Sequence, residues 1–241
     1  MRFLDIELYT ADPAGTRAFY TQQLGLPIVA ESSDYLTLQV GWTRLTFRAV
    51  TESVAPYHLA INVPSGTLEV CMHWYQLDYI DTQAPGQTIA EFPSWRARST
   101  YFYDNNGNLL EFIARNDLSL DSPNLTLGDL FQCISEIGIA TECVSETARQ
   151  LIQRFGIGPF AKSVQLPDFM AMGDDNGLLI LSKVGRNWLF TDTPAALNYC
   201  RIKFERTPGC QLQTLLGYDI NQMPIGYQVP NRPKPYTLSA L

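Results

Sequence analysis

The stretch Tyr101–Ile113, YFYDNNGNLLEFI, is typical of a strand, a tight turn and a second strand. Its Asn-Gly dipeptide at 106–107 tolerates positive φ at both central positions of a type I′ β-hairpin. On the second strand, β-alternation places Leu110 and Phe112 on one face and Glu111 on the other. A carboxylate within such an apolar run costs free energy unless it is paired, hydrogen-bonded or bound to a metal. A solvated strand face is the alternative for Glu111.

The composition is that of an ordinary globular protein, with 241 residues, 46% hydrophobic, 17% charged and a formal net charge of −7. We expect no nucleic-acid partner, because there is no run of Lys or Arg. The sequence begins directly with an alternating strand, and no apolar run is long enough to cross a bilayer, so we expect no signal peptide and no membrane partner. Five widely spaced cysteines without a Cys-x-x-Cys motif favour reduced thiols. These features predict a cytoplasmic monomer or homodimer.

The order strand, helix and three strands (βαβββ) occurs twice in the first half of the chain. The first copy begins with a strand at 3–9 and a helix over 14–24, for which Asp12 is the expected N-cap. Its remaining strands are expected at 28–31, 35–40 and 44–50. The second copy begins with a strand at 58–63 and a helix over 67–77, and it ends with the hairpin quoted above.

A third and weaker copy is expected after a polar stretch, with a strand at 136–143, a helix over 145–155 and a second hairpin. Four residues of the first hairpin recur 70 positions later, at Asp174, Asn176, Gly177 and Leu179. Glu111, however, is matched by Leu181, and this copy has Glu136 but no His. We therefore expect the third copy to be structural. Only one further strand is expected, at 199–205, and the Pro-rich tail from Met223 is expected to be extended.

These elements resemble the vicinal oxygen chelate superfamily, which includes glyoxalase I, bleomycin-resistance proteins and extradiol dioxygenases. The resemblance rests on the segment ELYTADPAGTRAFYTQQLGL, on His58 at the start of a strand, and on the hairpin FYDNNGNLLEFI. It implies an α+β fold in which tandem βαβββ modules form a cupped mixed sheet with helices outside. On this basis we expect a complete two-module domain at 1–115, a linker at 116–132 and a degenerate βαβββ unit with the Pro-rich tail at 133–241.

In that superfamily, metal ligands come from the first and last strands of each module. The first module has Asp5 where a His is usual, and the second has matching residues in His58 and Glu111. The resemblance thus implies a site of Asp5, His58 and Glu111 for a divalent ion such as Zn, Mg, Mn or Fe. Glu7 and Glu111 are the candidate catalytic carboxylates. The candidate substrate-binding residues are Tyr9, Arg48, Asn62, Tyr101 and Tyr103.

Each of these residues also has a structural interpretation. His58 could be a partly buried imidazole at a strand start, and Asp in the place of His is common in metal-free relatives. The chain contains only His58 and His73, which disfavours a two-His iron site and Ser-His-Asp or Cys-His catalysis. Two hypotheses stay open. The first is a metal-dependent lyase, isomerase or epimerase acting on a small oxygenated metabolite. The second is a metal-free protein, either a drug-sequestering binder or a regulator, that uses the same cup.

Overall fold

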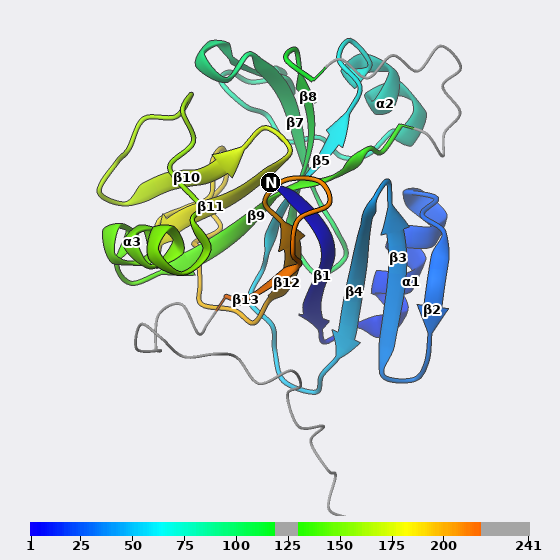
Figure 1. Cartoon of the computed structure of the whole chain (residues 1–241). Coiled ribbons are helices and arrows are strands. Elements are labelled where there is room, and N and C mark those ends of the chain that lie inside the picture. Colours follow the sequence, from blue (N-terminus) through cyan, green and yellow to red (C-terminus); the bar gives the residue numbers. More distant parts are fainter. Residues whose placement is uncertain (119–129, 218–241) are drawn as a thin grey trace, which may run out of the picture.

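The computed structural model describes residues 1–118 and 130–217, which form two mixed β-sheets with helices on their outer sides (Figure 1). The predicted α+β class is confirmed. Most of the expected linker at 116–132, and all of the Pro-rich tail from Met223, lie outside the described residues.

The six-stranded sheet joins the two ends of the described chain. Its strand order is β13-β12-β1-β4-β3-β2. Strand β1 is parallel to β4 and antiparallel to β12, so segments far apart in sequence lie side by side (Figure 1). Its strands are β1 (Arg2–Thr10), β2 (Ile28–Glu31), β3 (Tyr35–Val40), β4 (Thr43–Ala49), β12 (Arg201–Glu205) and β13 (Gln213–Leu216).

The seven-stranded sheet combines the second and third modules. Its order is β10-β11-β9-β5-β8-β7-β6, with β5 parallel to β8 and antiparallel to β9. Its strands are β5 (His58–Val63), β6 (Ala90–Phe92), β7 (Ala97–Tyr103), β8 (Leu109–Arg115), β9 (Cys133–Thr141), β10 (Phe169–Asp174) and β11 (Gly177–Lys183). This arrangement corrects the expectation that the first two modules share one cup within 1–115. The edge of β5 pairs with β9, and the corresponding edge of β1 pairs with β12.

Helices cover the outer sides of the sheets. The first is α1 (Pro13–Ala18), which continues as the π-helix η1 (Phe19–Gln23); the others are α2 (Leu68–Tyr75), the 3₁₀-helix η2 (Pro93–Trp95) and α3 (Val144–Phe155). As predicted, the Asp12 side chain caps α1, accepting a hydrogen bond of 2.9 Å from the Gly15 N–H. One apolar core extends across both sheets, with Phe47, Ile61 and Phe112 among its buried side chains. Within the described residues, no helix has the length and apolarity needed to span a membrane.

The backbone departs from regular geometry at two places. A β-bulge shifts the register of β1 between Phe3 and Asp5, and Phe3 is fully buried in the core. The hairpin of β7 and β8 forms as predicted, but its turn is not type I′. The Gly107 N–H donates to the carbonyl of Asp104 at 3.1 Å, so Asn105 and Asn106 are the central residues of the turn. Neither has positive φ, whereas Gly107, the last residue of the turn, has φ of 75°.

Candidate metal centre

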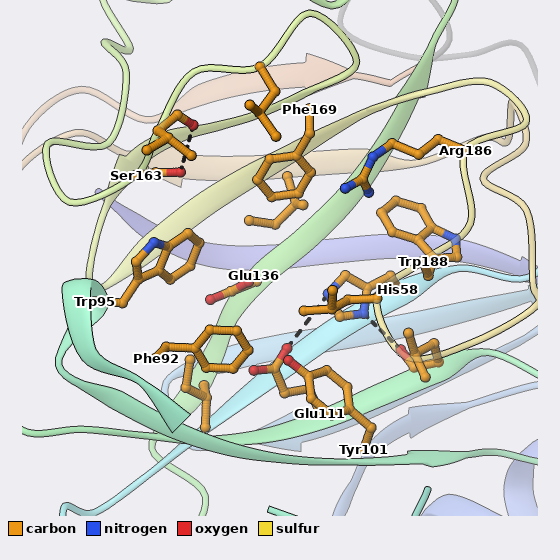
Figure 2. A pocket seen from close by; sticks show the side chains of 16 residues that line it. His58, Phe92, Trp95, Tyr101, Glu111, Glu136, Ser163, Phe169, Arg186 and Trp188 are labelled. Atoms are coloured by element: carbon orange, nitrogen blue, oxygen red, sulfur yellow. Dashed lines mark hydrogen bonds and ion pairs between the residues drawn. The ribbon is translucent and has the colours of Figure 1, made fainter. Parts of the chain in front are cut away.

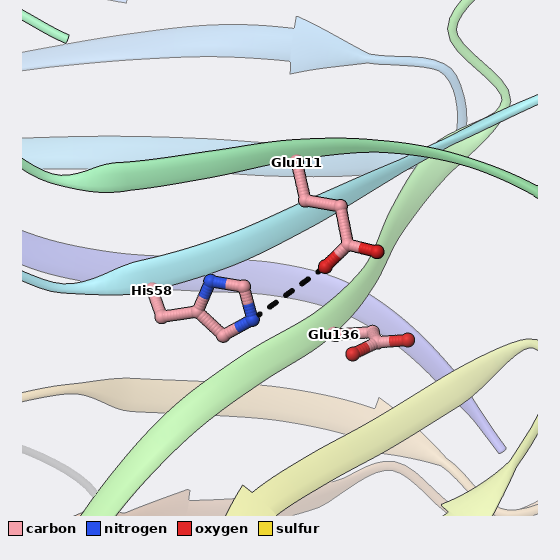
Figure 3. A group of neighbouring side chains, drawn as sticks. All are labelled: His58, Glu111 and Glu136. Atoms are coloured by element: carbon pink, nitrogen blue, oxygen red, sulfur yellow. Dashed lines mark ion pairs between the residues drawn. The ribbon is translucent and has the colours of Figure 1, made fainter. Parts of the chain in front are cut away.

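Three side chains converge from neighbouring strands of the seven-stranded sheet (Figure 3). In the sheet register, Ala60 of β5 lies opposite Glu111 of β8 on one side and Glu136 of β9 on the other. His58 lies two residues before Ala60 and therefore points to the same face. The potential ligand atoms of His58, Glu111 and Glu136 lie within 4.8 Å of one another, and all three residues are buried. Because Ala60 carries only a methyl group, its own strand does not fill the space between them.

The ring of His58 is held in the form that coordinates metals. Its Nδ1 atom lies 3.2 Å from the carbonyl oxygen of Leu109, which can only accept a hydrogen bond, so we assign the proton to Nδ1. Nε2 then keeps a free lone pair, 3.7 Å from Oε2 of Glu111. Burial lowers the pKa of His58 to about 4, so the imidazole is neutral at pH 7.

Glu111 is a buried carboxyl group with a raised pKa. Burial is the main cause, and the nearby negative charge of Glu136 raises the pKa further. Among the described residues, no Lys or Arg forms an ion pair with Glu111, and its Oε2 atom lies 3.7 Å from Nε2 of the neutral His58. A side-chain hydrogen bond from Tyr101 opposes the rise in pKa, and a retained proton or a cation beside the carboxyl group would stabilise it further.

Glu136 has a cationic partner in Arg115, whose side chain is fully buried. Arg115 Nη2 donates to Glu136 Oε1, and Nη1 donates to Asp175 Oδ1 at 3.4 Å. Burial raises the pKa of Glu136, and the guanidinium group opposes this effect. The cluster thus combines two carboxyl groups with one directly paired arginine, which leaves Glu111 to interact with a further cation.

The donor set of His58, Glu111 and Glu136 fits a divalent ion. One neutral imidazole nitrogen and two carboxylates suit Zn²⁺, Mn²⁺ or Fe²⁺, and the oxygens suit Mg²⁺. Two ligands opposite each other at about 2.1 Å from an ion are about 4.2 Å apart, so atoms within 4.8 Å need small movements only. Three protein ligands also leave coordination positions for a substrate.

A cavity of about 220 Å³ lies over this cluster (Figure 2). His58, Glu111 and Glu136 line its buried floor. Most of its wall is apolar or aromatic, formed by Phe92, Trp95, Tyr101, Leu109, Ile113, Phe169, Ile180 and Trp188. The cavity therefore combines a polar floor with an apolar wall, which is the usual design of a small-molecule site.

Trp188 packs against the imidazole on one side of the cavity. The ring centroids of Trp188 and His58 are 5.2 Å apart. A Cβ atom at position 138 would lie 2.5 Å from the indole ring, so Gly138 provides the space that Trp188 occupies. The glycine thereby contributes to the position of His58.

The structure separates two of the predicted carboxylates from this cluster. Asp5 and Glu7 lie on β1 of the six-stranded sheet, and neither lines the cavity. Glu7 is buried and engaged by Arg48 Nε at 2.8 Å, Arg201 Nη2 at 2.8 Å and the Tyr199 hydroxyl at 2.7 Å. The predicted grouping of Asp5 with His58 and Glu111 is thus corrected, because β1 and β5 belong to different sheets.

Of the predicted substrate-binding residues, Tyr101 lines the cavity and the other four do not. Tyr9 stacks on Tyr199 with ring centroids 4.2 Å apart, and Arg48 pairs with Glu7. Asn62 is buried and accepts a hydrogen bond of 2.8 Å from the Ser135 hydroxyl. The Tyr103 hydroxyl lies 3.2 Å from the hydroxyl of Thr193.

Sequence reasoning discounted Glu136 and did not consider Arg115. Glu136 carries the same signal as Glu111, since it stands in the apolar strand ISEIGIA. Its module lacks a His, which favours a structural role, but the neighbouring strand β5 supplies His58. No comparable sequence signal marks Arg115, whose burial depends on Glu136 and Asp175 from another module.

No family model matches the sequence, and no curated protein matches it. Among solved structures, a proposed dioxygenase from Bacillus subtilis is 17% identical, with a TM-score of 0.54 over 90% of this chain and 67% of that one. Glyoxalase I from Zea mays is 13% identical, with a TM-score of 0.47 over 76% of this chain and 66% of that one. A glyoxalase/bleomycin resistance protein/dioxygenase from Nocardioides is 20% identical, with a TM-score of 0.38 over 52% of this chain and 89% of that one. The likeness to the first of these shows that the chain shares the fold of that protein, in agreement with the fold predicted from the sequence.

Proposed function

We propose that this protein is a divalent-metal-dependent enzyme of the lyase or isomerase class, epimerases included, acting on a small oxygenated molecule. The observation that carries the proposal is the convergence of His58, Glu111 and Glu136 within 4.8 Å at the buried floor of a cavity. Three potential ligands in a shielded cavity are the arrangement expected of a catalytic ion with open coordination positions.

A divalent cation held by these residues supplies Lewis acidity toward the oxygen atoms of a substrate. His58 presents Nε2 because Nδ1 is anchored at the Leu109 carbonyl group. The raised pKa of Glu111 makes its carboxyl group able to accept and return a proton near neutral pH. The apolar wall excludes water from the reacting atoms. Glu111 is therefore our candidate for proton transfer, whereas Glu7 is already engaged by two arginines.

One observation favours a second candidate, a metal-free small-molecule binding protein. The wall of the cavity is mainly apolar, so an apolar ligand would bind there without an ion. Metal dependence separates the two functions.

The test uses untagged, chelator-treated protein titrated with Zn²⁺, Mn²⁺, Fe²⁺ and Mg²⁺. Calorimetry should find about one ion per chain for at least one metal. An ion at about 100 times its Kd stabilises a protein by about 2.7 kcal/mol. For a chain of this size that corresponds to a rise in Tm of about 5–11 °C. His58→Ala, Glu111→Gln and Glu136→Gln should each abolish the rise.

The chain offers matched controls for these variants. His73 is the second histidine of the chain and is exposed on α2, and Glu52 is exposed before β5. His73→Ala and Glu52→Gln should keep the metal-induced rise in Tm. Absence of any metal effect in the unmodified protein, or a full effect in all three cluster variants, would reject the metal enzyme. Binding of apolar ligands without metal would then support the second candidate.

Proton transfer at the metal-loaded site has its own assay. In D₂O, metal-loaded protein should catalyse exchange of the protons next to the carbonyl group of a simple α-hydroxyketone, followed by NMR. Glu111→Gln, which also loses the metal, should remove the exchange, and Glu52→Gln should not.

A further inference from the structure

The cavity above the cluster changes from a polar floor to an exposed apolar rim. Val164, Leu166 and Leu189, which we call the apolar rim, line the cavity and are 72%, 42% and 44% exposed. Val164 has the largest exposed fraction among the large hydrophobic residues that the structure describes. Single exposed apolar side chains are common, but three around one cavity form a surface that an apolar ligand would remove from water.

Above the floor, the cavity wall has few charged side chains that could bind a charged group of a ligand. Arg186 is the only Arg or Lys among the described lining residues. Its Nε atom pairs with Asp168 Oδ2 at 3.2 Å, and its guanidinium group lies 4.9 Å from the centre of the Phe169 ring. The polar end of a ligand is therefore best placed at the cluster, and its apolar part along the wall.

The volume of the cavity limits what it can enclose. An engineered cavity of about 150 Å³ takes up one benzene ring. At about 220 Å³, this cavity has room for one ring or a short alkyl chain together with a small polar head. Any longer apolar body must leave through the mouth, where it would contact the apolar rim.

We infer that the substrate is an amphiphile, with an oxygen-bearing head at His58, Glu111 and Glu136 and an apolar body that runs along the wall to Val164, Leu166 and Leu189. The inference rests on the proposed function, because the head is placed by the metal that these three residues would hold. It adds the chemical class of the substrate and assigns the apolar rim a role in binding.

The test measures binding of alkyl hydroxamic acids to the metal-loaded protein by calorimetry. These probes share one metal-chelating head and differ in chain length, from acetohydroxamic to butano-, hexano- and octanohydroxamic acid. Burying one methylene group corresponds to a gain in affinity of about fourfold. We expect affinity to rise about fourfold for each methylene group added along the series. The longest probes should reach the apolar rim.

Two variants separate the rim from the rest of the surface. The double variant Val164→Ser/Leu166→Ser should weaken octanohydroxamic acid about tenfold and leave acetohydroxamic acid unchanged. Leu212→Ser changes another exposed leucine, which does not line the cavity, and should behave like the unmodified protein. These changes are at exposed positions, so folding is not at issue.

The outcomes distinguish this inference from the proposed function. Metal binding with equal affinity for all four probes overturns the inference and leaves the metal enzyme standing. A chain-length gain that the double variant retains also overturns it, because the body then does not reach the rim. If no metal binds, the proposed function fails. Binding of n-alkanols of increasing length to the metal-free protein then tests whether the cavity and rim hold an apolar body. A gain that the double variant loses supports the apolar body, and no gain overturns it.

Discussion

Replacement of Arg115 by Met should destabilise the protein strongly. The Arg115 side chain is fully buried and pairs with Glu136 and Asp175. Methionine retains part of its apolar length but leaves the buried Glu136 without its cationic partner, whereas Asp175 keeps its ion pair with Lys162 at 2.6 Å. Removal of one partner from a buried ion pair costs about 3–5 kcal/mol. For a chain of 241 residues, 1 kcal/mol corresponds to about 2–4 °C, so Tm should fall by about 6–20 °C.

Scanning calorimetry on metal-free protein measures this change. Arg149→Met is the control, because Arg149 pairs with Glu146 on the exposed side of α3, where such a pair contributes about 0–1 kcal/mol. The double variant Arg115→Met/Glu136→Gln removes both charges of the buried pair and should melt above the single variant. A fall of less than about 3 °C in Arg115→Met, or no recovery in the double variant, would refute the assigned role of Arg115.

Two further predictions concern the floor of the cavity. Burial and the charge of Glu136 raise the pKa of Glu111 in the folded state. The metal-free protein therefore loses stability as pH rises from the ordinary glutamate value of about 4.3 through the raised value, and Glu111→Gln lacks this contribution and keeps only that of Glu136. One pKa unit is about 1.4 kcal/mol, so the Tm advantage of the variant should grow by at least about 3 °C from pH 5 to pH 9 in thermal melts; a constant difference would contradict this. At Gly138, an added methyl group would lie 2.5 Å from the Trp188 ring, so Gly138→Ala should cost about 1–3 kcal/mol and alter tryptophan fluorescence. Gly158→Ala, with no heavy atom within 4 Å of its added carbon, should do neither.

The modules could be predicted because short-range signals encode them. The Asp12 cap, the hairpin of β7 and β8 and the end of α3 at Phe155 each depend on a few adjacent residues. β-alternation placed Glu111 within an apolar strand pattern and left a buried carboxyl group and a solvated face open, and the family resemblance implied that it shares a site with His58. The modules follow from β-alternation and turn chemistry, which one sequence is sufficient to reveal.

The partner of each module could not be predicted in the same way. Strand β5 can extend its sheet with the module before it or the module after it, and its own alternation is equal in both cases. The structure pairs β5 with β9, which brings Glu136 to the cluster, and pairs β1 with β12, which takes Asp5 away. The decisive interactions are between residues distant in sequence, such as Arg115 with Asp175 and Glu7 with Arg201.

The six-stranded sheet is built from strands near both ends of the described chain, which has a consequence for folding during translation. All strands of the seven-stranded sheet lie within residues 58–183, whereas β1 must wait for β12, which begins at Arg201. At about 5–20 residues per second, the ribosome needs about 10–40 s to deliver that partner. Throughout this interval the nascent chain carries an open strand edge of the kind that chaperones cover and that other chains can join. The half with the candidate metal centre can therefore complete its sheet before β1 gains its second partner.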